Sequence, residues 1–297
     1  MIHAHHFHFV DQPTLQEEYA SFGFKSVVDQ TKNVICVEEI VTYKGFENRT
    51  VMRYLSGRAS FYLSDTLFDK ITANDDWGLE IEDVLTLIWD ASKKRILYGR
   101  GKLFTSKLLQ FWIFHTFFPI ALELQREYKM LHVGAVEVEG SPILFSGPSF
   151  AGKSTMTDFF LQQGHTLFSD DTLPVKEENG AYVVYPSFPY HRPYREPETL
   201  GYRVDNFARK PAVIKAVFDL VSVAPDAPVE IHSPKGIARF KSVFYSGFIK
   251  FSFMKKERLI FFSAMAQSIP VYQINIPWDK DRLPEVYDAI TQHVKTL

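Results

Sequence analysis

The sequence predicts an α/β fold for the part of the chain after residue 103, and an α+β fold overall. Three observations lead to this prediction. An apolar strand at residues 142–146 runs into a glycine-rich segment at residues 147–154, and a helix-like segment follows. Strands and helices then alternate at short spacing, as in an α/β core. The first 103 residues are instead mostly strand-like, so we expect a smaller, mostly β region before the core.

The N-terminal region carries the period-two alternation of apolar and polar side chains that is typical of β-strands. Residues 86–89 and 95–98 form a predicted hairpin across the turn at residues 90–93. Other alternating segments are residues 3–10, 34–41 and 51–55.

A helix is predicted next, over residues 105–128, with Ser106 as its N-cap. Because Gly99 and Gly101 interrupt the strand pattern just before it, we expect a boundary between residues 103 and 104. The two predicted domains are therefore residues 1–103 and 104–297.

The second predicted domain contains the elements of the α/β core. Residues 186–197 hold four of the sixteen prolines and form a rigid, non-helical loop, a candidate lid or substrate loop. The other expected elements are strands at residues 131–138, 142–146, 165–169 and 271–276, and helices at residues 155–161, 257–267 and 283–294.

The glycine-rich segment matches the pattern G-x-x-x-x-G-K-[ST] of a phosphate-binding loop. Its backbone N–H groups can surround phosphates, its lysine supplies a cation, and its serine hydroxyl can bind Mg²⁺. The N-terminus of the following helix also favours an anion. Coincidence is the alternative, because the bare pattern occurs by chance in about one chain of this length in a hundred. The predicted nucleotide-binding residues are Gly147, Pro148, Ser149, Phe150, Ala151, Gly152, Lys153, Ser154 and Thr155.

Composition and charge exclude several classes of protein. A net charge of -2 and a pI near 6.6, without a basic block, argue against a nucleic-acid binder. The single cysteine, Cys36, and the lack of a secretory signal favour a cytoplasmic protein. The longest apolar run, residues 108–124, is interrupted by Gln110, Pro119 and Glu123, so no membrane span is expected.

Two acidic residues, Asp170 and Asp171, follow the predicted strand at residues 165–169. Carboxylates at a strand end beside a phosphate loop are suited to hold Mg²⁺, or to accept a proton from an attacking hydroxyl. The alternative is a solvent-exposed Asp-Asp-Thr turn.

Histidines offer weaker signals. His132 begins the strand that leads to the phosphate loop, and a lone histidine there is more often a hydrogen-bonded structural residue. His3, His5, His6 and His8 have no carboxylate or cysteine to complete a ligand set. We therefore expect them on an exposed edge strand rather than at a metal.

The order of these motifs resembles that of the HPr kinase/phosphorylase family. That family carries a histidine strand, a phosphate loop, an R/Q-G-H segment and an Asp-Asp pair. Here they correspond to residues 131–135, 147–154, 163–165 and 170–171. The resemblance covers roughly residues 105–297 and is closest to the HPr kinase-like branch, whose members often stand beside lasso-peptide or polysaccharide biosynthesis enzymes. Residues 186–189 and 269–274 also resemble segments of that branch.

The resemblance implies a phosphate-loop core related to phosphoenolpyruvate carboxykinase and an ATP- and Mg²⁺-dependent transfer of phosphate to a serine hydroxyl. It implies Lys153 as the phosphate-binding lysine and Ser154 with Asp171 as metal ligands. It also implies Asp170 as the general base and His132 as the active-site histidine. Two departures, Phe150 for glycine and Thr155 for glutamate, argue against HPr itself as the acceptor.

The acceptor is expected to be a peptide, such as a lasso-peptide precursor, another protein or a small hydroxylated molecule. Arg192, Arg195 and Glu196, with Glu198 as an alternative, are the candidate substrate residues in the proline-rich loop. Two other readings remain open: a catalytically impaired ATP-binding sensor or scaffold subunit, and a simple ATPase. The sequence also leaves open homo-oligomerisation, ATP against GTP, and the reverse phosphorolysis.

Overall fold

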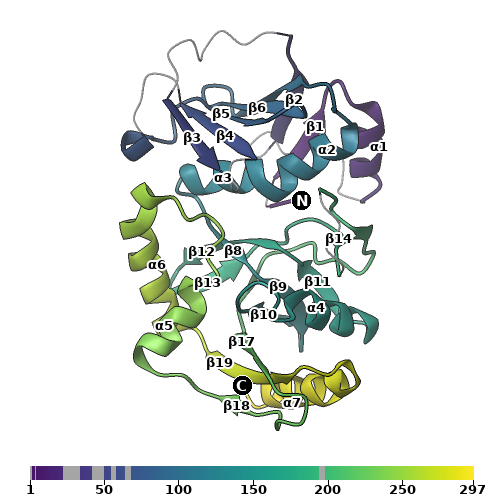
Figure 1. Ribbon diagram of the computed structural model, residues 1–297, viewed down its shortest axis with the longest axis vertical. Coiled ribbons are helices and arrows are strands. Elements are labelled where there is room, and N and C mark those ends of the chain that lie inside the picture. Colours follow the sequence, from purple (N-terminus) through teal and green to yellow (C-terminus); the bar gives the residue numbers. More distant parts are fainter. Residues whose placement is uncertain are drawn as a thin grey trace. The chain divides into compact units, whose positions relative to one another are not determined.

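The computed structural model describes residues 2–3, 5–22, 34–41, 50–54, 58–63, 68–193 and 198–297. The chain divides into two compact units, Met1–Glu127 and Tyr128–Leu297 (Figure 1). It is a mixed α/β protein with several sheets. Among the described residues, no helix is both long and apolar enough to cross a membrane.

The first unit is built on a seven-stranded sheet of order β1-β2-β7-β6-β5-β4-β3. The predicted hairpin is confirmed, because β6 and β7 pair antiparallel with Trp89 opposite Ile96. The two observed strands include the predicted ranges, residues 86–89 and 95–98. The strands are β1 (His6–Phe9), β2 (Val34–Glu39), β3 (Thr50–Tyr54), β4 (Ala59–Leu63), β5 (Trp77–Ile81), β6 (Leu85–Asp90) and β7 (Arg95–Arg100).

A helical segment packs on this sheet. It consists of α2 (Ser106–Phe111), the π-helical turn η3 (Trp112–Phe117) and α3 (Phe118–Leu124), while α1 (Pro13–Ala20) and η2 (Phe68–Lys70) lie elsewhere in the unit. The fully buried Phe7 on β1 contacts the rings of Phe114 and Phe118, and Trp77 on β5 contacts Phe117. These aromatic contacts hold the segment to the first unit. The boundary between the compact units lies after Glu127, whereas the sequence pattern placed the domain boundary between residues 103 and 104.

The N-terminal histidines are not on an exposed surface, in contrast to the expectation. Strand β1 does lie at the edge of its sheet, but His3, His5 and His6 are buried and only His8 is exposed. Burial lowers the pKa of His3 to about 3, against the raising effect of its contact with the Phe114 carbonyl. These rings therefore belong to the core of the unit.

Thr105, rather than the predicted Ser106, caps α2. Its hydroxyl accepts a hydrogen bond from the N–H of Leu108 at 3.1 Å, and its backbone is extended. We expect Thr105→Ala to lower the free energy of unfolding by about 1 kcal/mol, because the N–H of Leu108 loses its acceptor. Urea denaturation measures the change, and Lys107→Ala on the exposed side of the same turn is the control. An unchanged stability in Thr105→Ala would show that water replaces the cap at no cost.

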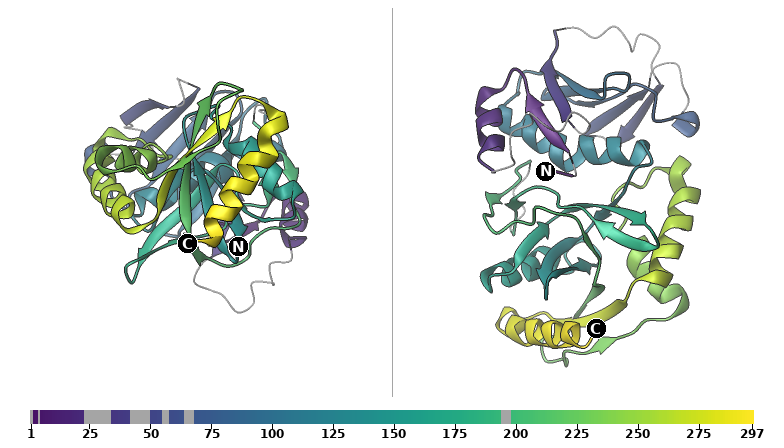
Figure 2. Two further views of the ribbon diagram at one scale, coloured as in Figure 1. Left: turned by 90° about the horizontal axis from the view of Figure 1, so that it is seen from below. Right: turned by 180° about the vertical axis from the view of Figure 1, so that it is seen from behind.

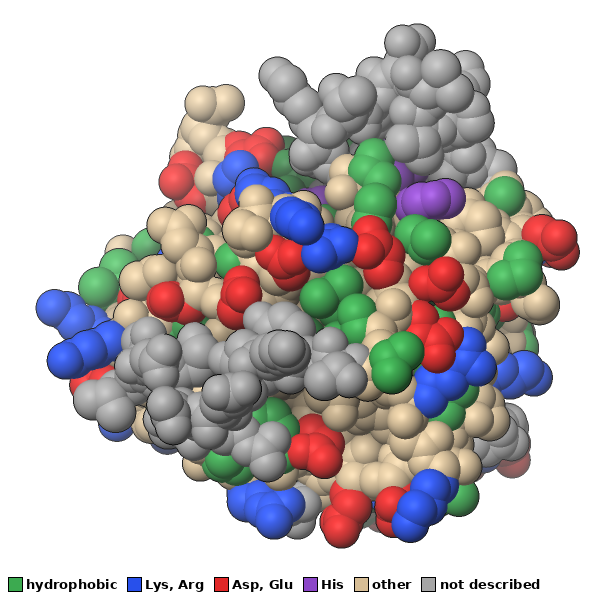
Figure 3. All heavy atoms as spheres, turned by 90° about the horizontal axis from the view of Figure 1, so that it is seen from above, with side chains coloured by type: hydrophobic (Ala, Val, Ile, Leu, Met, Phe, Trp, Pro, Cys, Tyr) green, Lys and Arg blue, Asp and Glu red, His purple; other side chains and the backbone are tan. Residues whose placement is uncertain are grey.

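Charged side chains of both signs are interspersed on the face drawn in Figure 3. This distribution agrees with the net charge of -2.

The second unit contains two main sheets. A six-stranded sheet has the order β11-β9-β10-β17-β19-β18, and a four-stranded sheet the order β16-β13-β12-β8. Strands β10, β17 and β19 run parallel, which is the α/β part of the fold. The strands are β8 (Lys129–His132), β9 (Gly134–Val138), β10 (Ser141–Ser146), β11 (Thr166–Ser169), β12 (Thr172–Glu178), β13 (Ala181–Val184), β14 (Tyr190–His191), β15 (Tyr202–Arg203), β16 (Ala212–Val213), β17 (Ala216–Val223), β18 (Ile231–His232) and β19 (Val271–Pro277).

One predicted strand, residues 131–138, is in fact two. Strand β8 pairs with β12 in the smaller sheet, whereas β9 pairs with β10 and β11 in the larger one. Val133 lies between the two strands, and its N–H donates a hydrogen bond to the Asp171 carbonyl oxygen. The chain changes sheets at this point because each half of the apolar run has a different partner.

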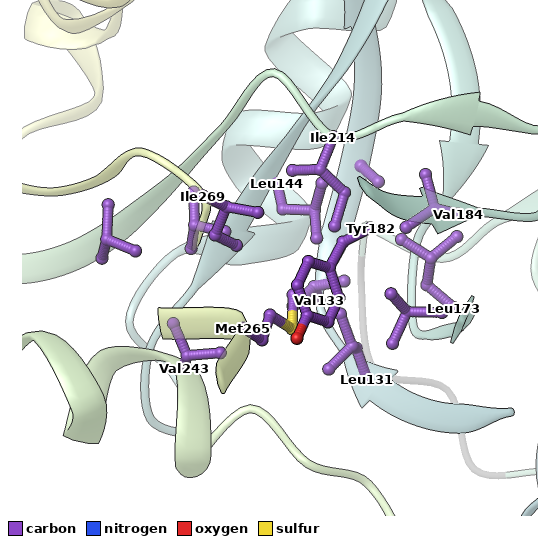
Figure 4. Close-up of a cluster of buried hydrophobic side chains, with 14 of the residues drawn as sticks. Leu131, Val133, Leu144, Leu173, Tyr182, Val184, Ile214, Val243, Met265 and Ile269 are labelled. Carbon is purple, nitrogen blue, oxygen red and sulfur yellow. The ribbon is translucent and has the colours of Figure 1, made fainter. Parts of the chain in front are cut away.

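Helices cover both faces of the larger sheet (Figure 2). Leu144 of β10 packs in a cluster with Val243 of α5 and Met265 of α6 (Figure 4). On the opposite face, Phe145 packs in a second cluster with residues of α4 and α7. Strand β10 is therefore buried on both sides. The helical elements are α4 (Lys153–Gln162), α5 (Gly236–Phe244), η4 (Ser252–Met254), α6 (Lys255–Ser268), η5 (Lys280–Arg282) and α7 (Leu283–Lys295).

Candidate active site

The glycine-rich segment connects β10 directly to α4, as predicted. Gly147 has φ 140°, and a Cβ there would lie 3.1 Å from the Leu220 carbonyl oxygen, so glycine is needed at this position. Gly152 has φ 94° and precedes the first residue of α4. The loop thus bends where the two glycines of the pattern stand.

Phe150, at the position where the related family has glycine, adopts φ 69°. Left-handed backbone costs a residue with a Cβ about 1–2 kcal/mol relative to glycine. The side chain is 73% exposed. The loop therefore holds a residue with a Cβ in left-handed backbone.

Lys153 lies along the inside of this loop. Its side chain is 7% exposed, and its Nζ donates to the carbonyl oxygens of Gly147 at 2.9 Å and Pro148 at 3.0 Å. Ser154 is half-buried on the first turn of α4. An ammonium group and a hydroxyl are thus available at the start of the helix.

Helix α4 lies very close to β9. The Thr157 hydroxyl donates to the Lys153 carbonyl at 3.1 Å, and a Cβ on Gly134 would lie 2.1 Å from that hydroxyl oxygen. A larger residue at Gly134 would push the helix away. This contact helps to fix the position of the first turn of α4.

The two aspartates form the turn between β11 and β12, and they are not a solvent-exposed turn. Asp170 is buried and Asp171 is half-buried. Asp171 Oδ1 lies 2.7 Å from His132 Nδ1, an ion-pair contact if the ring is protonated. The pairing of β8 with β12 places Thr172 opposite His132 and so produces this contact.

The proline-rich segment reaches the same turn. The Arg192 N–H donates to Asp170 Oδ2 at 2.7 Å, and its guanidinium lies 3.7 Å from Asp171 Oδ2. Of the other predicted substrate residues, Arg195 and Glu196 fall outside the described residues. Glu198 is described, in left-handed backbone at φ 55°.

Two residues that the sequence did not indicate join this group. His191 Nδ1 lies 3.1 Å from Asp170 Oδ2, and its Nε2 hydrogen-bonds Asp158 Oδ1, also at 3.1 Å. Asp158 lies on α4, the helix that begins at Lys153. The available signal was a histidine directly before Arg192 in the segment already suspected of contacting substrate.

His191 has a raised pKa. Burial by itself would lower the pKa of this ring, but the hydrogen bond and charge of Asp170, and then the charge of Asp158, raise it above 6.5. A group whose pKa is higher in the folded state stabilises the fold below its unfolded pKa, and this contribution declines as the pH rises through the folded value.

We therefore expect the stability difference between wild type and His191→Gln to be largest at pH 6.5 and below, and to shrink at higher pH. Urea unfolding from about pH 6 to about pH 9 measures it. His232→Gln, an exposed histidine of the same unit, is the control. A difference that grows with pH would contradict the charged state of the ring.

The donor set is chemically suited to a hard cation and a phosphate. A serine hydroxyl and one carboxylate are oxygen ligands, and Mg²⁺ in proteins commonly combines one or two such ligands with phosphate oxygens and water. Among the residues that the structure describes, no cluster of three or more His, Cys, Asp or Glu could hold a metal by itself. Ser154 and Asp171 therefore fit Mg²⁺ only as part of a complex with a phosphate.

The fold and this site define a mixed α/β protein with a glycine-rich strand–loop–helix junction and a nearby acidic turn. No protein-family model matches the chain. Two curated proteins of Clostridium botulinum do match it, and both are named HPr kinase/phosphorylase. The protein of strain Eklund 17B is 29% identical over 126 residues, 42% of this chain and 38% of its own. That of strain Alaska E43 is 31% identical over 96 residues, 32% of this chain and 30% of its own.

The chain thus spans about a third of the length of the curated relatives that it matches. A solved structure, the Hpr(Ser) kinase/phosphatase from Coxiella burnetii, matches with a TM-score of 0.34 and 15% identity, over 57% of this chain and 91% of that one. The sequence matches confirm that this chain resembles the HPr kinase/phosphorylase family, as the order of its motifs predicted.

Proposed function

We propose that the protein is an ATP-dependent kinase that transfers the γ-phosphoryl group to a serine-type hydroxyl. The observation that carries the proposal is the connection from Asp170 through His191 to Asp158 on α4. It joins the acidic turn to the helix that starts at the glycine-rich loop. The name of the two related proteins, HPr kinase/phosphorylase, supports a phosphoryl transfer.

ATP would be held by the loop from Gly147 to Ser154. Lys153 would exchange its two carbonyl partners for phosphate oxygens, and the loop amides and the positive end of α4 would attract the same anion. Mg²⁺, bound by Ser154 and Asp171 together with the phosphates, would neutralise negative charge on the transferred group. Thr155 would lie beside these groups without contributing a carboxylate.

Asp170 would act as the general base. It takes the proton of the acceptor hydroxyl while that oxygen forms a bond to the γ-phosphorus. The bond from the γ-phosphorus to the oxygen shared with the β-phosphate breaks, and ADP leaves with that oxygen. His132 would hold Asp171 in place through the 2.7 Å contact. Positioning and charge neutralisation supply most of the acceleration in this class of reaction.

The acceptor would be a hydroxyl of a peptide, a protein or a small molecule, with a lasso-peptide precursor as one candidate. Arg192, already at the acidic turn, is the first candidate to bind it, with Arg195 and Glu196 from the same segment. We place the reaction in the cytoplasm, because a single cysteine cannot form an internal disulfide and fits a reducing compartment.

One observation favours a second candidate, an ATP-binding sensor or scaffold subunit. Phe150 and Thr155 depart from the motif of the resembled family, and Phe150 holds left-handed backbone at a cost that glycine would not have. Such a protein would bind nucleotide without transferring phosphate.

Two measurements distinguish these functions. Calorimetry tests binding of ATP and GTP with and without Mg²⁺, and labelled ATP with cell extract tests transfer. Binding with labelled acceptor supports the kinase, and binding without label supports the sensor. Repeated release of ADP to water, with no labelled acceptor in the extract, supports a simple ATPase. Failure to bind either nucleotide contradicts all three.

A further inference from the structure

His191 lies between two carboxylates that come from different elements. Its side chain is 0% exposed, with Asp158 of α4 at one ring nitrogen and Asp170 of the acidic turn at the other. The pairing of β14 with β15, which sets His191 opposite Tyr202, holds the ring there. Gly201 permits this pairing, because a Cβ on it would lie 2.1 Å from the His191 carbonyl oxygen.

This arrangement favours a positive charge on the ring. Each ring nitrogen lies 3.1 Å from a carboxylate oxygen. Only Nε2 meets hydrogen-bond geometry, with Asp158 Oδ1, while Nδ1 lies close to Asp170 Oδ2 without it. Two ionised carboxylates at these distances favour the imidazolium form of the ring through their charge. The raised pKa of His191 agrees with this.

Other groups hold Asp158 so that it can support the ring. The Tyr202 hydroxyl donates to Asp158 Oδ1 at 2.9 Å, and the Gln162 amide donates to Oδ2 at 2.8 Å. The groups facing His191 are thus Asp158 from α4, Asp170 from the turn and Tyr202 from β15, with Arg192 adjacent in sequence. The negative charges of Asp158 and Asp170 together outweigh the positive charge of Arg192.

The two carboxylate oxygens of Asp170 differ in their hydrogen-bond partners. Oδ2 faces His191 and accepts the hydrogen bond of the Arg192 N–H. Oδ1 is buried and has no hydrogen-bond partner among the described residues. A buried carboxylate oxygen without a donor is costly and uncommon, and a catalytic role is one explanation for it.

We propose that His191 is a positioning residue: held by Asp158, it fixes Oδ2 of Asp170 and leaves Oδ1 as the oxygen that takes the proton of the acceptor. This inference rests on the proposed kinase function. It adds a structural connection between α4 and the proposed base, Asp170, because Asp158 and Lys153 both lie on α4.

The test uses Mg²⁺·ATP, with water as the acceptor, and measures kcat, the Kd of ATP and the pH profile. We expect His191→Gln to lower kcat about 10- to 100-fold with an unchanged Kd of ATP, as is typical for partners that orient a reacting group. The wild-type kcat should fall at alkaline pH as His191 loses its proton. This fall should move to lower pH in Asp158→Asn, which removes one supporting charge but keeps a hydrogen-bond acceptor, and should vanish in His191→Gln. His232→Gln is the matched control and should behave as the wild type.

Three results would overturn the inference: a wild-type kcat in His191→Gln, an equal loss of kcat and ATP affinity, or an unmoved alkaline limb in Asp158→Asn. If His191→Gln does not fold, the Asp158→Asn profile decides. Nitrogen NMR of histidine-labelled wild type without ATP adds an independent readout, since a singly protonated His191 at neutral pH also overturns it. A wild type that binds no Mg²⁺·ATP would instead contradict the proposed function, so the two failures are distinguishable.

Discussion

Asp170→Asn is expected to lower kcat for phosphoryl transfer roughly 100- to 10,000-fold, the range of general base catalysis, while ATP binds about as tightly as before. Asparagine has the same shape as aspartate and can still accept the hydrogen bond of the Arg192 N–H, now 2.7 Å from Oδ2. It cannot take up a proton at neutral pH. The expected loss therefore falls on the chemical step rather than on nucleotide binding, and labelled transfer combined with calorimetry separates the two.

Asp205→Asn is the matched control, since its side chain belongs to the same unit and is 90% exposed. This variant should retain the activity of the wild type. Equal activity in Asp170→Asn and Asp205→Asn would remove Asp170 from the role of base. An equal loss of ATP affinity and turnover in Asp170→Asn would instead assign Asp170 to nucleotide binding.

The second large effect is expected for Lys153→Met, which should weaken ATP binding by about 10- to 150-fold. The estimate follows from the 1.5–3 kcal/mol that a hydrogen bond to a charged group contributes. Methionine keeps an unbranched, largely apolar side chain in this buried position but removes the cation that would meet the phosphates. The variant also loses the two hydrogen bonds to the carbonyl oxygens of Gly147 and Pro148. Calorimetry with Mg²⁺·ATP measures the change.

Lys256→Met, at an exposed position of α6, controls for the loss of one positive charge. Its effect on ATP affinity should be small, because the charge is exposed to solvent and screened by salt. Wild-type affinity in Lys153→Met would contradict phosphate binding by the loop. Urea denaturation of both variants shows whether any loss reflects folding instead.

Local patterns in the sequence predicted local structure well. The strand at residues 142–146, the glycine-rich turn and the following helix were expected and are observed, because each is set by neighbouring residues. The hairpin of β6 and β7 was predicted for the same reason. Features that depend on contacts between distant parts of the chain were not predicted. The apolar run of residues 131–138 gave no indication that it divides between two sheets, because both halves are equally apolar.

The boundary between the units depends on distant contacts in the same way. The helical segment after residue 103 follows a clear break in the strand pattern, yet its aromatic side chains pack on strands from the start of the chain, as the contact of Phe7 with Phe118 shows. No local pattern reports such a partner. The N-terminal histidines were misjudged for the same reason, since polar residues were taken to be exposed while their rings are buried against phenylalanines.

The candidate site was predictable to the extent that its motifs are short. The sequence alone indicated the glycine-rich loop, the acidic pair and His132, and the structure brings His132 to Asp171. The roles of these residues remain predictions. The partnership of Asp158 with His191 was not predictable, because neither belongs to a motif and the two are joined only by the folded chain.

The burial of β10 on both faces has a consequence for how this protein can diversify. A substitution in that strand disturbs packing against Leu144 on one face or Phe145 on the other, so the frame under the loop tolerates little change. The short β14–β15 ribbon lies outside both clusters, and Arg192 follows directly after its first strand. Under the proposed function, new acceptors are therefore expected to be acquired through changes at Arg192, with His191 and the frame under the loop unchanged.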